Sequence, residues 1–122
     1  MKTGTVGELL VQLRLLQYAI QAAPPLKDSG NDLIAVKGWV CKAIQVKTSA
    51  KGVFNLKGLA GKKYHILALV FLRGDGRDIH LDNSDIYILT KEEVGDKLSY
   101  NINELSTMDI KLTEKRLNKL FK

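Results

Sequence analysis

Three side chains in the first half of the chain have the types and the spacing for metal-assisted chemistry on a phosphate. Gln45 and Lys47 are two positions apart in a stretch rich in Val and Ile. On a β-strand, residues two apart project from the same face of the sheet. A hairpin that turns about positions 38 and 39 pairs Asp32 with Gln45. We therefore expect Asp32, Gln45 and Lys47 to converge in one patch.

The donor atoms in this patch match the preference of magnesium. The Asp32 carboxylate, the Gln45 amide oxygen and the main-chain carbonyl of Val46 are hard oxygen ligands, which Mg²⁺ prefers and which Mn²⁺ also accepts. A lysine beside such a metal can orient or deprotonate a water, or offset the charge that builds on a phosphate. The combination predicts metal-assisted attack of water on a phosphodiester.

The patch depends on a β-hairpin. The stretches Asp32 to Lys37 and Val40 to Thr48 are rich in β-branched residues and are typical of strands. The short connection between them contains Gly38, which predicts an antiparallel hairpin. Trp39, at the hairpin end, is expected to be a packing residue rather than a platform on which bases stack.

The chain before the hairpin is typical of a half-buried helix of about four turns. The segment from Thr5 to Glu8 has the spacing of a capping box, with Thr5 as the N-cap. Pro24 and Pro25 are expected to end the helix, because the residue before a proline is pushed out of the α region. The expected apolar positions at helical spacing are Leu9, Leu13, Leu16, Ile20 and Ala23.

The second half of the chain alternates strand and helix signals. The segments His65 to Leu72 and Asp85 to Leu89 predict strands, and the first is almost continuously apolar, as in a central strand covered on both faces. Thr90 is a candidate cap for a helical turn. A short C-terminal helix is expected from Thr113, and its apolar positions are Leu117, Leu120 and Phe121. Residues 1–122 therefore predict one α/β domain with a mixed central sheet flanked by helices.

Charge and composition favour a polyanionic partner over a membrane. The 122 residues carry a formal charge of +6, and seven lysines with no acidic residue lie between Lys37 and Lys63. Such a basic run is either a solvated face or a phosphate-binding surface, and its position around the hairpin favours phosphate contact. The expected nucleic-acid contacts are Ser49, Lys51, Lys57, Lys62 and Lys63.

Two further observations bear on the compartment. No apolar run approaches the roughly 18 residues of a membrane span, and Arg14 interrupts the first apolar stretch, which argues against a secretory signal peptide. Cys41 is the single cysteine and suits a reducing compartment. We expect a cytoplasmic protein that does not bind membranes.

The motifs together resemble the PD-(D/E)XK nuclease superfamily. The pattern combines Gly4-x-x-Gly7-Glu8, then Pro25-x-x-Asp28-x-Gly30-x-Asp32, then Gln45-Val46-Lys47-Thr48-Ser49. It is similar to restriction endonucleases and archaeal Holliday-junction resolvases, and most similar to intron-associated homing endonucleases of this fold. The resemblance implies a restriction-endonuclease-like core and a Mg²⁺-dependent DNA endonuclease. It also implies that Glu8 and Asp32 hold the metal, that Gln45 fills the D/E position, and that Lys47 is catalytic.

The sequence departs from the superfamily at one position. Gln45 replaces an acid, so the metal site has one negative charge fewer. This leaves two alternatives open beside the homing endonuclease, namely a weakened or inactive nucleic-acid-binding module on the same fold, or a Holliday-junction resolvase. Because a domain of this size offers one cut site, cleavage of both strands predicts a homodimer or a higher symmetric homo-oligomer.

Several of these residues also have plain structural interpretations. Glu8 can serve only as a cap, Asp28 is typical of a turn, and Gln45 with Lys47 can form the polar face of a strand. A protein-interaction surface on the last helix has no specific support beyond its apolar residues.

Overall fold

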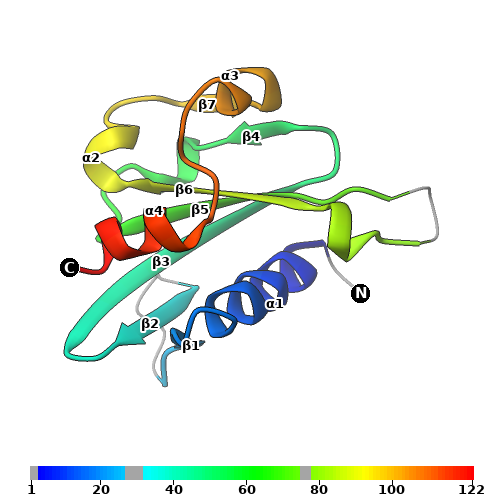
Figure 1. Ribbon diagram of the computed structural model, residues 1–122. Coiled ribbons are helices and arrows are strands. Elements are labelled where there is room, and N and C mark those ends of the chain that lie inside the picture. The colour runs from blue at the N-terminus through cyan, green and yellow to red at the C-terminus, as the bar shows by residue number, and fades with distance from the viewer. Residues whose placement is uncertain (1–2, 27–31, 75–77) are drawn as a thin grey trace.

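A five-stranded sheet organises the protein. The computed structural model describes residues 3–26, 32–74 and 78–122. Its main sheet has the strand order β1-β2-β3-β5-β6 (Figure 1). β3 and β5 are parallel and the other neighbours are antiparallel, so the sheet is mixed, as predicted. The strands are β1 (Gln21–Ala23), β2 (Leu33–Lys37), β3 (Val40–Ser49), β5 (Ile66–Phe71) and β6 (Asp85–Thr90).

Helices and a smaller sheet cover the two faces. The long helix α1 (Thr3–Leu16) packs against β3 and β1, while β4 (Val53–Asn55) and β7 (Ser99–Asn101) form a two-stranded sheet on the opposite side (Figure 1). The remaining elements are the 3-10 turns η1 (Lys57–Leu59) and η2 (Leu81–Asn83) and the helices α2 (Lys91–Val94), α3 (Ile102–Ser106) and α4 (Glu114–Leu120). This arrangement confirms the predicted α/β class.

Two hydrophobic cores explain the continuous apolar run along β5. Ala68 and Val70 contribute to a core that includes residues of α1 and α4. Leu67 and Leu69 contribute to a second core, which includes residues of β4, β7 and α3. Successive side chains on a strand point to opposite faces, so a strand between two cores needs apolar residues at every position.

The hairpin has the predicted register. Lys37 pairs with Val40, and Leu33 pairs with Ile44, so the turn is centred on positions 38 and 39. Trp39 is not a packing residue, however, because its side chain is 103% exposed. Trp39 is a residue of the two-residue turn, directly between the last strand pair, Lys37 and Val40. The prediction for this residue was wrong.

The helix α1 ends earlier than the prolines predicted. Ile20 N–H donates to the Leu15 carbonyl and Ala19 N–H donates to the Leu16 carbonyl, which is the Schellman arrangement. Ala19 has a φ of 61°, in the left-handed position that glycine usually fills. Because an alanine stands there, the sequence carries no stop signal, and the chain after it forms β1 instead of more helix.

The start of α1 and its buried face also differ from prediction. The helix already includes Thr3, so Thr5 lies inside it and is not its N-cap. The outward face carries leucines that are 53–58% exposed, namely Leu9, Leu13 and Leu16. The residues of α1 that pack against the sheet are Val6, Leu10, Val11 and Leu15.

The later elements largely match prediction. Thr90 caps α2 in a full capping box with Glu93, and Thr113 caps α4. Leu117, Leu120 and Phe121 are buried, as expected. The sequence did not indicate β1, β4, β7 or α3, whose strands are three residues long and whose helix has five. In the described part of the chain, no helix combines the length and the apolar character that a membrane span requires.

Candidate active site

Asp32 is fixed at the point where β2 begins. Its main-chain N–H donates to the Ile44 carbonyl (3.2 Å), and its carboxylate Oδ2 accepts a hydrogen bond from the Val46 N–H (2.8 Å). β2 starts one residue later, whereas β3 continues to Ser49. The carboxylate therefore takes the place of the next backbone acceptor that a longer β2 would supply.

The Val46 carbonyl faces the same side as this carboxylate. The carbonyls of Ala43 and Ser49 accept bonds from His65 and Leu72, on the β5 side of the strand. The N–H and C=O of one strand residue point to the same neighbour, and the direction alternates along the strand. The peptide groups of even-numbered residues, Val46 among them, thus face away from β5 and toward the space beyond the start of β2.

Glu8 approaches Asp32 from the helix α1. Burial, the negative charge of Asp32 and a hydrogen bond with the Asp32 side chain all raise the pKa of Glu8 above its ordinary value. Two carboxyl groups this close require a proton or a cation between them to relieve their repulsion. The Glu8, Asp32 and Val46 oxygens therefore form a compact donor set at the start of β2.

A close contact between helix and strand sets the position of Glu8. A Cβ added at Gly7 would collide with Thr48 Oγ1, so only glycine allows α1 to lie this close to β3. Thr48 Oγ1 is buried, and among the described residues it has no hydrogen-bond partner. This contact therefore also sets the distance between β3 and Glu8, the next residue of the helix.

Gln45 and Lys47 project from the opposite face of β3 to Val46. The core on the α1 side contains Ile44 and Val46, so the alternating residues Gln45 and Lys47 point toward the side of β4. Gln45 is 2% exposed and Lys47 is half-buried. The pairing of β2 with β3 ends at Leu33 and Ile44, one residue short of Asp32 and Gln45.

The candidate metal ligands carry few negative charges. Within residues 3–26, 32–74 and 78–122, no three His, Cys, Asp or Glu side chains gather into a group that could hold a metal ion. The candidate ligands are two carboxylates, an amide and a peptide carbonyl, all of them hard oxygen donors that suit Mg²⁺. Asp28, a second acid near the hairpin, lies outside the described residues.

The predicted nucleic-acid residues lie mainly on the connection from β3 to β5. This connection packs on the β4 side of the sheet, the side toward which Gln45 and Lys47 point. Lys51, Lys57 and Lys63 are exposed and Lys62 is half-buried. The Ser49 hydroxyl accepts hydrogen bonds from the N–H groups of Lys51, Gly52 and Val53, so it shapes the turn into β4.

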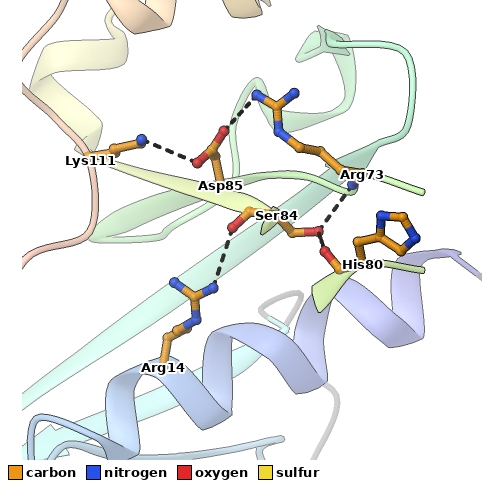
Figure 2. Close-up of polar contacts among 6 residues, drawn as sticks. All are labelled: Arg14, Arg73, His80, Ser84, Asp85 and Lys111. Carbon is orange, nitrogen blue, oxygen red and sulfur yellow. Dashed lines mark hydrogen bonds and ion pairs between the residues drawn. The ribbon is translucent and has the colours of Figure 1, made fainter. Parts of the chain in front are cut away.

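A polar network that the sequence did not reveal connects the end of β5 with the start of β6 (Figure 2). Arg73 and Lys111 both form ion pairs with Asp85, at 2.9 and 3.2 Å. Burial alone would raise the pKa of Asp85, but hydrogen bonds from these two cations hold it below its ordinary value. The Ser84 hydroxyl accepts the Arg73 N–H and donates to the His80 carbonyl.

The same network reaches α1. Arg14 donates to the Leu81 carbonyl at 3.2 Å and to the Ser84 carbonyl at 3.4 Å, and Figure 2 shows the second bond. The helix that carries Glu8 is thereby anchored at two points, at Gly7 on β3 and at Arg14 on the segment before β6. Pairings between residues this far apart in the chain leave no local sequence signal.

One solved structure with this fold is that of a bacterial homing endonuclease, I-Ssp6803I. The TM-score is 0.62, and the similarity covers 97% of this chain and 87% of that chain at 15% sequence identity. The two chains share a fold. No protein-family model matches the sequence, and no curated protein matches it. I-Ssp6803I thus supports the nuclease-like core that the hairpin and helix motifs predicted.

Proposed function

We propose that this protein is a metal-dependent DNA endonuclease that hydrolyses phosphodiester bonds, with a QxK variant of the PD-(D/E)XK motif. The observation that carries the proposal is the cluster at the start of β2, where the Asp32 carboxylate binds the Val46 N–H beside the Glu8 carboxyl group. The shared fold with a homing endonuclease supports the same conclusion.

The residues present fit a magnesium ion. Burial is the main cause of the raised pKa of Glu8, and the charge and hydrogen bond of Asp32 add to it, as expected for two neighbouring acids. Glu8, Asp32 and the Val46 carbonyl would hold Mg²⁺, or Mn²⁺ in its place, and the Gln45 amide would have to reach the ion around the edge of β3 from the opposite face. The ion would supply Lewis acidity toward the phosphate and lower the pKa of a bound water.

Lys47 is the proposed catalytic lysine. It is two positions from Gln45 on the same face of β3. It is also half-buried, so solvent screens its charge less than that of an exposed lysine. It would orient or deprotonate the attacking water, or offset the charge that builds on the phosphate. The lysines on the same side of the sheet, Lys51, Lys57, Lys62 and Lys63, would bind the DNA backbone together with Ser49.

One site per chain can cut one strand at a time. Cleavage of both strands then calls for two copies related by symmetry. We propose a homodimer or a higher symmetric homo-oligomer, which a mass measurement in solution tests directly. A strict monomer would limit the activity to nicking or to single-stranded substrates.

The decisive experiment is cleavage of supercoiled plasmid and of a synthetic four-way junction with Mg²⁺, Mn²⁺ or EDTA. We expect metal-dependent cutting that Lys47→Ala and Asp32→Asn abolish. Asn keeps an acceptor for the Val46 N–H, so Asp32→Asn tests the charge and not the hairpin. The matched control is Lys115→Ala, an exposed lysine on α4. Full activity of a folded Lys47→Ala protein would overturn the proposal, and the preferred DNA separates an endonuclease from a junction resolvase.

A second candidate function is a nucleic-acid-binding module that has lost catalysis. The observation that favours it is Gln45, which is 2% exposed and already interacts within the chain. This candidate predicts salt-sensitive DNA binding and no metal binding that depends on Asp32. Calorimetric titration with Mn²⁺ distinguishes the two. Gln45→Glu strengthens metal binding if position 45 is a ligand, and leaves it unchanged if the amide is only structural.

A further inference from the structure

The tip of the β2–β3 hairpin presents an uncovered indole. Trp39 is the only tryptophan in the chain and is fully exposed. The strand pairing continues to Lys37 and Val40, directly on either side of the turn, and Gly38 has a φ of 60° that makes the tight turn possible. The ring is therefore carried by a paired hairpin rather than by a loose loop, and little ordering is lost when it meets a ligand.

The hairpin that carries this indole is basic. The chain from Lys37 to Lys63 has seven lysines and no acid, and Lys37 and Lys42 are the two nearest to Trp39 in sequence. At the tip, the Lys37 ammonium group donates to the Asn118 side chain of α4 (2.6 Å), which holds the cation beside the hairpin. Lys42 is half-buried on β3, three positions past Trp39. An exposed aromatic ring on a lysine-rich hairpin matches a polyanion that also offers flat rings, and a nucleic acid has both features.

The indole is remote from the candidate cut site but on the same strand. β3 rises about 3.3 Å per residue, so Trp39 lies about 23 Å from Val46 along the strand. A contact at this distance contributes to binding and does not reach the reacting phosphate.

We propose that Trp39 stacks on a nucleobase of the bound nucleic acid, which makes the hairpin tip a second contact apart from the cut site. The proposal rests on nucleic-acid binding by the proposed endonuclease. An indole needs a free base face, so the base it contacts must be out of the duplex stack, in a single strand or at a kinked or branched position. The tip thus favours DNA with unstacked bases over a regular duplex.

The test uses the single tryptophan as its own probe. In EDTA, where cutting is blocked, a labelled single-stranded oligonucleotide and a matched duplex are titrated with the protein. Binding is followed by anisotropy of the label, and Trp39 by its fluorescence. We expect quenching of Trp39 that follows the anisotropy, and Trp39→Ala is expected to weaken single-strand binding about 5- to 150-fold. Trp39→Phe, which keeps an aromatic face, should restore most of the affinity.

The control is Leu98→Ala, which removes another exposed apolar side chain, away from the hairpin, and should bind like the wild type. Equal melting temperatures show that the variants fold. Wild-type binding without any change in Trp39 emission, or an unchanged affinity of Trp39→Ala, overturns stacking and leaves the nuclease proposal standing. An absence of DNA binding by the wild type overturns both. A change in emission with protein concentration alone assigns the tip to a second copy and overturns the stacking proposal.

Cleavage assays separate binding from chemistry. Trp39→Ala should raise KM for DNA and leave kcat unchanged, whereas an equal loss in kcat and in kcat/KM would place the indole in the catalytic machinery and contradict the proposal.

Discussion

The carboxyl groups of Glu8 and Asp32 lie against each other, one from the first helix and the other from the residue before β2. Each is fixed by a separate contact, because Asp32 binds the Val46 N–H while Glu8 follows the glycine that packs on Thr48. The pair stores electrostatic repulsion that a proton or a cation relieves.

The pKa of Glu8 should respond to its neighbour. Asp32→Asn removes one charge and is expected to shift the pKa of Glu8 toward its ordinary value of 4.5. NMR titration of the side-chain carboxyl carbons measures the shift, with Glu114→Gln on α4 as the control. An unchanged Glu8 titration would show that burial alone raises its pKa.

The same pair makes stability fall as pH rises. Because the folded state holds the Glu8 proton more tightly than the unfolded state, the stability that Glu8 contributes is lost from about pH 4.5 upward through the raised pKa. In chemical denaturation the metal-free protein should lose this contribution with rising pH, and added Mg²⁺ should restore it. Glu8→Gln should flatten the profile over that range.

Gly7 should be intolerant of a methyl group as long as Thr48 is present. Gly7→Ala forces the helix away from β3, which we expect to cost about 1–3 kcal/mol and to weaken Mn²⁺ binding through the displaced Glu8. In a Thr48→Gly background the three atoms nearest to the added methyl group are gone, and the better helix propensity of alanine makes the change neutral or stabilising by up to about 1 kcal/mol. A double-mutant cycle from urea unfolding measures this difference, and additive effects would contradict it.

Ala19→Gly should stabilise the protein. Ala19 holds the left-handed position of the Schellman motif, and glycine adopts that conformation without the steric penalty. The greater freedom of glycine in the unfolded chain offsets part of the gain, which leaves about 0.5–1 kcal/mol. The control is Ala60→Gly, at a φ of −58°, which should destabilise by a similar amount. Equal effects of the two changes in thermal unfolding would refute the argument.

Glu93 should stabilise the fold only above acid pH. Burial alone would raise its pKa, but the Thr90 N–H and the Arg116 guanidinium group hold it below the ordinary 4.5. Its contribution is present above about pH 4.5 and is lost as pH falls through the lowered value. We expect Glu93→Gln to cost about 1 kcal/mol at pH 7 and progressively less in acid. Glu92→Gln, its exposed neighbour, is the matched control in the same denaturation series.

The sequence predicted what is set locally. The hairpin register follows from a turn of fixed length, so the pairing of Leu33 with Ile44 was accessible from spacing alone. The end of α1 could not be predicted in this way, because its left-handed residue is Ala19 rather than a glycine. Two leucine-rich faces compete on this helix, and the face that packs is the one containing Gly7, whose fit against Thr48 depends on tertiary structure.

The candidate site also has a part that the sequence predicted and a part that only the tertiary structure determines. Asp32 lies directly before the first residue of β2 and accepts a hydrogen bond from the Val46 N–H, so the hairpin places it beside the residue that follows Gln45. Glu8 reaches Asp32 only because α1 crosses β3 at Gly7, and no capping role places it there. Arg14 secures that crossing through carbonyls that lie far along the chain, at Leu81 and Ser84.

The unequal lengths of β2 and β3 also bear on the solubility of the protein. β3 has ten residues and β2 has five, so within the described residues no strand pairs with the second half of β3 on that side. An open edge invites pairing with a strand of another molecule and hence aggregation. The Asp32 carboxylate occupies the first donor of that edge and places a charge there. A substitution such as Asp32→Ala would free the Val46 N–H and remove the charge. The same carboxylate that suits a metal therefore also protects the protein from self-association through this strand edge.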